Sequence, residues 1–384
     1  MSIFRRTFIC LLLVSSLLGG SIVNADTSLP SASDHWSDTL KQWASENGII
    51  EGYSDGSFQP DKLISEAEFL KVLYEAFDNG LLRNAETDGT IKSRIDTLYK
   101  FAKEWNHPVV GTASSKLRTK PITYAQAAAI IASANGVHFE GQNNLIYLIG
   151  HGMVHSDSAS LSTFKSDSPL TRAEAIQWIR QLTVAGMMSI QERPKSLSKR
   201  SMLPSLVNAP KPLPLFSTQP LAKDDFDLIG SDTQSVLKLW DSKASVDARF
   251  GKPQGISFGL SPYPSFSVKY NKVDLIGLWS ISNDDEYTDT NQNFSTSKGI
   301  IVGKSTLRDV LLQYGTAGYL SPGRAYLFYE QAEDESYFSL DPFFQDTPIN
   351  NRNQTYGFAF FFDEETLKVD LIMSFWLPVV SGEN

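Results

Sequence analysis

Three segments of the chain carry the same helix-starting signal. They are residues 65–68 (SEAE), 123–126 (TYAQ) and 171–174 (TRAE), and a run of apolar residues follows each one. In such a segment the first hydroxyl accepts a bond from the amide three residues on, and the Glu or Gln there bonds back, which forms a capping box. Because the signal recurs at comparable intervals, the sequence predicts an internal repeat built on helices.

Each copy is predicted to form a helix, a break and a second helix. In the first copy, Leu40, Trp43 and Ala44 share one face of a helix that ends at residues 48–50 (GII). The second copy has a helical pattern from Ile95 that is broken at Pro108. The third copy has apolar residues at 145–149 and the break at 150–154 (GHGMV).

These motifs resemble the S-layer homology (SLH) domain of Gram-positive surface proteins. The first copy (residues 33–80) reads HW, then GIIEGYSDGSFQP, then ISEAE, and the third (143–184) keeps the TRAE signature. The second copy (92–136) has TYAQ in that place and is degenerate. The resemblance implies an all-α-rich pseudo-trimer that binds secondary cell-wall polysaccharide, which in the family often carries a pyruvate ketal.

Arg172 is the main candidate binding residue. It follows the capping Thr171 at the first helical position, where free amides favour an anion, and a guanidinium can grip a carboxylate with two bonds. The alternative is an exposed arginine beside a cap. The resemblance implies that Arg172 contacts the pyruvate ketal, while Thr171 and Glu174 act first as helix caps.

Trp36, Tyr53 and Gly52 are further carbohydrate-binding candidates by the same resemblance. Both aromatic rings could instead pack in a core. The first copy has Glu66 at the arginine position and the second has Tyr124. Because a carboxylate repels an anionic ligand, the first groove is expected to be inactive or to bind a neutral sugar, which leaves one competent site.

The N-terminus predicts secretion. Arg5 and Arg6 precede an apolar run at 8–18, and small residues end at Ala25, which is typical of a signal peptide over residues 1–25. The run is shorter than a membrane anchor requires, so no membrane span is expected after cleavage. Cys10 is the one cysteine, and the mature chain would therefore hold no disulfide and no cysteine metal site. Together with the repeats, this predicts a secreted protein at the cell wall of a Gram-positive bacterium.

The charge balance limits the partners. The chain has 34 basic and 43 acidic residues and a formal net charge of −9. Nucleic acid is excluded as a partner because its phosphates require a basic face. An anionic wall polymer must be bound by local geometry. His151 and His155 have a metal-ligand spacing but no carboxylate partner, so no metal and no cofactor are expected.

The rest of the chain predicts a linker and a second folded part. Dense prolines and basic residues over 190–223 favour an extended, solvated spacer. In residues 224–378, KVDLI at 272–276 recurs at 368–372, and VDARFG at 246–251 parallels RDVLLQYG at 308–315. The halves predict a tandem α+β module with antiparallel strands at 266–270 and 356–362. The pattern is similar to secreted modules of the β-lactamase-inhibitor-protein type.

The sequence thus predicts a multidomain, non-catalytic surface protein with an SLH-like anchor and a displayed C-terminal binding module. One alternative is a protein-binding or inhibitor-type module, with an unknown protein partner, on a stem that binds no wall. The aromatic residues at 356–362 are expected to fill a sheet core, whereas an exposed aromatic face would favour this alternative. The other alternative is a wall-glycan hydrolase using carboxylates at 284–286 or 333–335, although charged loop tips are the commoner explanation.

Overall fold

The chain forms two compact units that meet in sequence between Leu215 and Phe216. The computed structural model describes residues 35–77, 94–154, 166–231, 235–253, 255, 260–263, 266–270, 276–282, 294–340, 349, 351–363 and 366–381. The signal peptide predicted at residues 1–25 lies outside these residues. The first unit is helical and the second is α+β with antiparallel sheets, so a multidomain chain of this class is confirmed.

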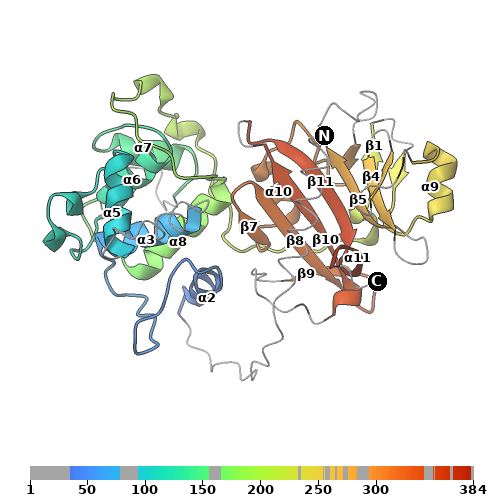
Figure 1. Ribbon diagram of the computed structural model, residues 1–384, viewed down its shortest axis with the longest axis horizontal. Coiled ribbons are helices and arrows are strands. Elements are labelled where there is room, and N and C mark those ends of the chain that lie inside the picture. The colour runs from blue at the N-terminus through green and yellow to red at the C-terminus, as the bar shows by residue number, and fades with distance from the viewer. Residues whose placement is uncertain are drawn as a thin grey trace. The chain divides into compact units, whose positions relative to one another are not determined.

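Within its described residues, the helical unit contains three pairs of helices in sequence (Figure 1). They are α2 (Asp38–Glu46) with α3 (Glu66–Phe77), α5 (Arg94–Glu104) with α6 (Tyr124–Ala134), and α7 (Asn143–Gly150) with α8 (Arg172–Ala185). Short 3-10 turns lie at η2 (Val110–Thr112), η3 (Ser115–Leu117), η5 (Arg200–Met202) and η6 (Leu206–Asn208).

The sequence patterns of these helices explain their positions. Helix α2 buries Leu40, Trp43 and Ala44, which confirms the predicted apolar face. Helices α3 and α8 are buried on most sides, as expected of central helices. The three predicted capping boxes are confirmed, with Ser65, Thr123 and Thr171 as the cap residues.

The segments that lead into α3, α6 and α8 close into a ring of backbone hydrogen bonds. The amide of Ile64 donates to the Leu170 carbonyl, that of Leu170 to Ile122, and that of Ile122 to Ile64, each at 3.0 Å. All three side chains are buried. Since each segment donates to one neighbour and accepts from the other, the three helix starts are fixed relative to one another.

The first two amides of each following helix extend this ring. They donate to carbonyls of the neighbouring segment as follows: Glu66 and Ala67 to Lys120 and Arg118, Tyr124 and Ala125 to Ser168 and Ser166, and Arg172 and Ala173 to Lys62 and Pro60. These amides would otherwise have no partner inside their own helix. The ring therefore satisfies the helix starts with backbone carbonyls.

The break between the helices of each pair contains a residue whose backbone has a positive φ, in the left-handed region. Gly48 (φ 65°), Asn106 (φ 58°) and Gly152 (φ 67°) hold it in the first, second and third pairs. Asparagine tolerates this region better than most residues with a side chain. The second pair therefore turns at Asn106, two residues before Pro108, where the sequence places the break.

The segment of residues 191–215, here called the proline segment, docks on the helical unit. The amide of Gln191 donates to the Ala134 carbonyl at 2.8 Å, and the amide of Arg193 donates to Trp105 at 3.0 Å. The Ser198 amide donates to the His138 carbonyl, and the His138 amide donates to the Ser198 hydroxyl oxygen. Residues 217–223 already belong to the second unit, where Ser217 bonds Thr316. The segment is extended as its composition indicates, but it is not the solvated spacer predicted for 190–223.

His107 joins this segment to the core. Its Nε2 donates to the Gln191 carbonyl at 2.8 Å, so the neutral ring accepts the Tyr74 hydroxyl at Nδ1, 2.6 Å away. Burial lowers the pKa of His107 below its usual 6.5, and the charge of Arg193 acts in the same direction. Protonation would place a second donor against Tyr74.

We expect stability to fall as the pH drops below 6.5, because the unfolded His107 then binds a proton that the folded one does not. The slope is at most about 1.4 kcal/mol per pH unit from this residue. Urea unfolding between pH 7 and pH 5 measures it in the mature chain and in His107→Gln. Burial also lowers the pKa of His151, which is present in both proteins. Equal slopes in the two proteins would contradict the assignment to His107.

The α+β unit is built on one large antiparallel sheet. Its strand order is β3-β4-β5-β11-β10-β8-β7, with β9 pairing β8. The strands are β3 (Ser261–Tyr263), β4 (Phe266–Tyr270), β5 (Ile276–Ser282), β7 (Tyr319–Ser321), β8 (Arg324–Gln331), β9 (Tyr337–Ser339), β10 (Thr355–Phe362) and β11 (Val369–Trp376).

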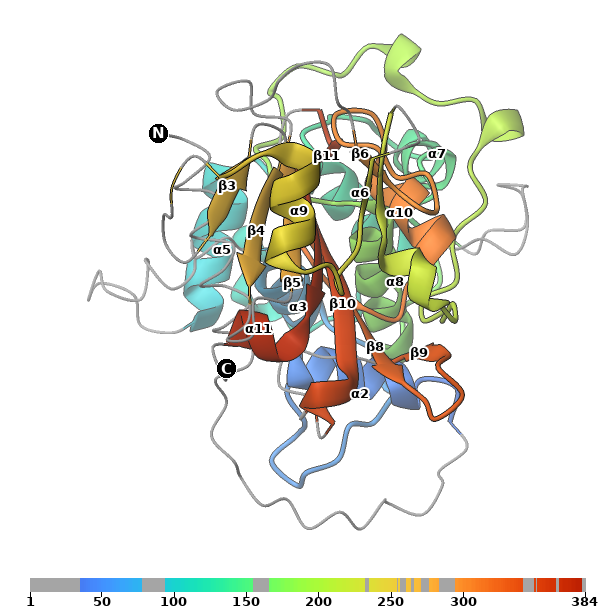
Figure 2. The same cartoon turned by 90° about the vertical axis from the view of Figure 1, so that its right-hand side faces the viewer.

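A small sheet and several helices complete this unit. The sheet has the order β2-β1-β6, from β1 (Leu228–Gly230), β2 (Val236–Leu237) and β6 (Phe294–Thr296). The helices are α9 (Lys243–Phe250), α10 (Leu307–Tyr314) and α11 (Leu377–Ser381), with 3-10 turns η7 (Lys223–Phe226) and η8 (Arg352–Gln354). Figures 1 and 2 both place α11 at one end of the sheet, where it packs on β5 and β11.

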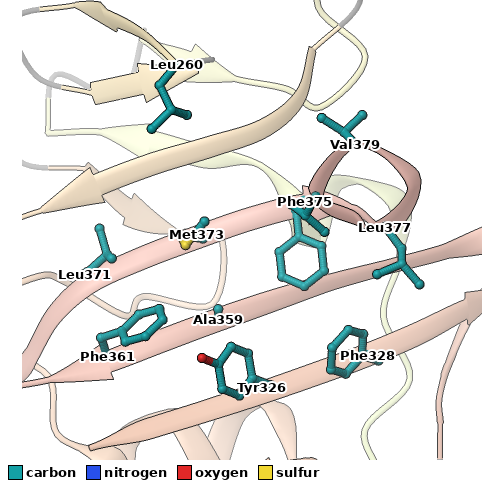
Figure 3. Close-up of a cluster of buried hydrophobic side chains, with 11 residues drawn as sticks. Leu260, Tyr326, Phe328, Ala359, Phe361, Leu371, Met373, Phe375, Leu377 and Val379 are labelled. Carbon is teal, nitrogen blue, oxygen red and sulfur yellow. The ribbon is translucent and has the colours of Figure 1, made fainter. Parts of the chain in front are cut away.

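The sheet is buried on both faces at β10. On one face Phe358 stacks on Phe226, with centroids 5.4 Å apart, and also contacts Tyr314 of α10. On the other face Ala359 and Phe361 belong to a cluster with β8, β11 and α11 (Figure 3). The aromatic residues of this strand therefore fill a core. The exposed aromatic face that would favour a protein-binding module is not found at β10.

The two predicted repeats meet at the centre of the sheet. Strand β5 of the first half pairs with β11 of the second half, with Trp279 opposite Ser374 and Leu278 opposite Phe375. In the sequence alignment of the repeats, Leu278 corresponds to Ser374 and Trp279 to Phe375. Exchanging the two repeats therefore turns the pair Trp279–Ser374 into the pair Phe375–Leu278, so the pairing of β5 with β11 is symmetric. Residues 272–275 of the first copy lie outside the described residues.

Candidate functional site

Thr171 and Glu174 form the cap that the sequence predicts for α8. The Thr171 amide donates to Glu174 Oε2 at 2.7 Å, and the Glu174 amide donates to Thr171 Oγ1 at 3.2 Å. The amides of Arg172 and Ala173 donate to Lys62 and Pro60 in the ring described above. The expected free amides at this helix start are therefore not available to an anion, and that part of the argument for Arg172 is wrong.

The Arg172 side chain is buried, with 3% of the residue exposed. Its Nε donates to the Phe58 carbonyl at 3.0 Å and its Nη2 to the Glu51 carbonyl at 3.0 Å. Its Nη1 lies 3.2 Å from Glu68 Oε1. Three of the five N–H groups of the guanidinium are thus used to join α8 to the turn of the first pair. It is not an exposed arginine beside a cap.

Tyr53 lies against this guanidinium. The Arg172 guanidinium carbon is 4.5 Å from the ring centroid, and the Lys62 ammonium is 3.9 Å from it. The Tyr53 hydroxyl donates to Glu68 Oε1 at 3.1 Å. A cation over an aromatic face is stabilised by the ring quadrupole. Tyr53 is therefore placed by two cations and a carboxylate, and it is only partly buried.

Glu68 balances the charge in this cluster. Burial alone would raise its pKa, but hydrogen bonds from Ser65 and Tyr53 and the charge of Arg172 outweigh burial and hold the pKa below its usual value. Glu68 is therefore ionised at neutral pH. It serves both the capping box of α3 and the contact to α8, a double role that the sequence does not reveal.

Gly52 belongs to the turn that presents Tyr53. A Cβ at this position would lie 3.3 Å from the Ser57 carbonyl oxygen. The turn itself is closed by a bond from the Tyr53 amide to that same carbonyl, 2.9 Å away. Gly52 thus permits a close approach of two backbone segments, and it offers a ligand only backbone atoms.

Trp36 lies on the surface, with 54% of the residue exposed. The neighbouring His35 has its Nε2 3.4 Å from Asp61, and its ring is 5.7 Å from that of Trp36. Leu63, which the sequence reasoning did not select, is also exposed in the same loop as Asp61. Core packing is therefore excluded for Trp36, and its ring can receive the apolar face of a sugar.

The other two positions equivalent to Arg172 differ from it and from each other. Glu66 is buried and accepts bonds from Tyr99 of α5 and from Val110 of the turn η2. The ring centroids of Tyr124 and Trp178 are 5.3 Å apart. Burial, followed by the hydrogen bond to Glu174, raises the pKa of the Tyr124 hydroxyl. Arg172 is thus the one cation among these three positions.

The carboxylates considered for hydrolysis are not gathered in a described cleft. Glu333 and Asp334 lie in the exposed turn between β8 and β9, where Asp334 accepts bonds from Ser336. Residues 284–286 and His155 lie outside the described residues. In the part of the chain that the structure covers, no three His, Cys, Asp or Glu residues are grouped to hold a metal ion.

Comparison with known families identifies the first of the helix pairs. The family model of the S-layer homology domain matches residues 33–70. The chain is therefore a protein with an S-layer homology domain, which implies anchoring at the cell surface to a cell-wall polymer. No curated protein matches the chain. Among the described helices, none has both the length and the apolar character needed to cross a membrane.

Proposed function

We propose that residues 33–184 form one three-repeat S-layer homology unit, of which the family match covers the first part. The ring of hydrogen bonds carries this proposal. Ile64, Ile122 and Leu170 are related by the same bond, and the next amides of each repeat follow the same pattern. Three helix pairs in equivalent surroundings support a pseudo-threefold arrangement in which the degenerate second copy has kept its backbone role.

The proposed activity is non-covalent attachment of a secreted protein to secondary cell-wall polysaccharide, at the surface around Trp36, Tyr53 and Lys62. Trp36 offers an exposed ring for a sugar face, and Lys62 is an exposed cation for an acidic substituent such as a pyruvate ketal. Arg172 contacts the Tyr53 ring, and its charge is paired with Glu68. Its bonds to backbone carbonyls make it first a positioning residue of this surface.

The α+β unit is proposed to be a non-catalytic binding module made of two repeats. The symmetric pairing of β5 with β11 supports the tandem arrangement, because both halves contribute the same strand to the centre of the sheet. Helices α9 and α10 begin at Ser242 and Thr306 caps in corresponding places.

Co-sedimentation of the full mature chain with purified cell walls tests the attachment. Trp36→Ala and Lys62→Ala change exposed side chains, so we expect about 10-fold weaker binding at unchanged melting temperature. Leu197→Ala and Lys103→Ala, which are exposed elsewhere on the helical unit, are the matched controls. Removal of pyruvate ketals from the walls should abolish the effect of Lys62→Ala. Equal binding by all four variants would contradict the proposed surface.

A further inference from the structure

The carboxylate of Glu66 lies in a cradle of three donors. The Tyr99 hydroxyl donates to Oε1 at 2.9 Å, the Gly111 amide to Oε1 at 2.7 Å and the Val110 amide to Oε2 at 2.9 Å. The residue is only 3% exposed. Two successive backbone amides and a hydroxyl that converge on one point are a typical anion-binding arrangement.

The residues around the cradle hold its shape. A Cβ on Gly111 would lie 2.4 Å from the Tyr99 ring and 2.6 Å from Arg118, so only glycine lets both side chains pack there. Arg118 Nε donates to the Gly111 carbonyl at 3.1 Å, and its guanidinium carbon lies 4.3 Å from the Tyr99 centroid. Burial, followed by the charge of Glu66, raises the pKa of Tyr99, which therefore remains a donor.

The opposite polarity is found where α8 meets the first repeat. Arg172, at the same helical position as Glu66, donates to two backbone carbonyls and to Glu68. Glu66 instead accepts from two backbone amides and a hydroxyl. Each side chain is matched to the polarity of the surface it meets, so Glu66 does not act by repelling a ligand across an open groove.

We propose that residues 99, 110 and 111 form an anion site between the first two repeats, that the chain fills it with its own Glu66 carboxylate, and that a small monocarboxylate binds there once this side chain is removed. While Glu66 is in place, an acidic substituent of a wall polymer is excluded from this junction. This last consequence rests on the proposed attachment function. The anion site itself does not.

Chemical rescue of Glu66→Ala tests the site in the full mature chain. The melting temperature of the helical unit is measured in sodium formate and in sodium chloride at equal ionic strength. We expect the variant to melt well below the native chain in chloride, and formate to raise its melting temperature by at least about 3 °C. Benzoate, which is too large for the vacated space, should give no rescue. The native chain and Glu104→Ala, an exposed glutamate in α5, should respond to neither carboxylate.

Equal melting temperatures of Glu66→Ala in formate and chloride would overturn the proposal. If this variant does not fold in chloride, folding recovered in formate supports the site, and failure in both salts counts against it. Glu66→Gln gives a second measure, because its single oxygen can replace only one of the two carboxylate oxygens, and its NH2 group then faces the N–H donor on the other side. We expect it to melt lower than Glu104→Gln, and equal melting of the two would also overturn the proposal. No wall polymer is used, so failure here is distinct from failure of wall attachment.

Discussion

Replacing Arg172 by alanine is expected to destabilise the helical unit by about 3–5 kcal/mol. The guanidinium is buried and bonds the carbonyls of Phe58 and Glu51 and the carboxylate of Glu68. Each buried acceptor that loses its partner costs about 1–3 kcal/mol. Glu68 is partly exposed and the bond to Glu51 is only partly buried, so water replaces some of their loss, and the buried bond to the Phe58 carbonyl dominates the expected effect.

Urea unfolding of the mature chain measures this loss, with Arg172→Lys and Arg200→Ala beside it. Lysine keeps the charge but cannot make the three directed bonds, so an intermediate loss is expected. Arg200 is exposed in the proline segment, and its replacement should change stability by no more than about 0.5 kcal/mol. A loss below about 1 kcal/mol for Arg172→Ala would show that the guanidinium is not the link between α8 and the first repeat.

This result bears on how wall binding is tested. An Arg172→Ala variant that fails to bind would leave two explanations, lost contact and lost folding. Trp36 and Lys62 avoid this ambiguity because neither is buried. The surface around Tyr53 is therefore best examined through its exposed residues, with Arg172 tested for stability.

Local signals in the sequence were sufficient for the helix starts. A capping box involves four consecutive residues, so Thr171 and Glu174 could be assigned without knowledge of the fold. The buried face of α2 and the strands at β4 and β10 follow from periodicity in the same way. These features depend on neighbours in sequence, and the structure has them where they were predicted.

The surroundings of Arg172 and Glu66 could not be predicted in this way. Arg172 bonds residues 51–68, and Glu66 bonds residues 99–111, so each environment depends on how the repeats pack. The sequence reasoning placed both side chains in open grooves and inferred attraction or repulsion from charge alone. Burial with directed donors and acceptors changes that conclusion, because the partners are fixed backbone groups.

The composition of the proline segment predicts an extended chain, but it does not predict whether that chain packs on the helical unit. Prolines make the chain extended, and an extended chain can be solvated or docked. Docking here depends on two glycines, one at the end of α7 and one in the break that follows it. A Cβ on Gly150 would lie 2.1 Å from Pro204, and one on Gly152 would lie 3.4 Å from Pro210. Such matches between distant residues are not visible in either segment alone.

Removal of the proline segment is expected to have the second large effect. A fragment that ends at Ile190 should be less stable than one that ends at Leu215 by about 2–4 kcal/mol. It loses the backbone bonds of Gln191 and Arg193 and the bond from His107, each with a net value of about 0.5–1.5 kcal/mol. The entropy of ordering the segment offsets part of this sum.

Arg180 makes the loss larger than a count of bonds indicates. This residue is fully buried in α8, where its Nε donates to the Leu215 carbonyl at 3.2 Å and its guanidinium carbon lies 5.1 Å from the Trp43 centroid. Burial lowers its pKa to about 9, which reflects the cost of keeping a cation there. Without Leu215 that cost is less well compensated, and α8 loses part of its cover.

Urea unfolding of three fragments separates docking from chain length. The first ends at Leu215, the second at Ile190, and the third carries a Gly/Ser sequence of equal length in place of residues 191–215. If docking stabilises the unit, the third fragment behaves like the second, whereas equal stability of all three would contradict it. Gly150→Val in the first fragment should move its stability toward the second, because the new side chain displaces Pro204. The expected order follows from the unit boundary at Leu215, which makes the proline segment part of the helical unit.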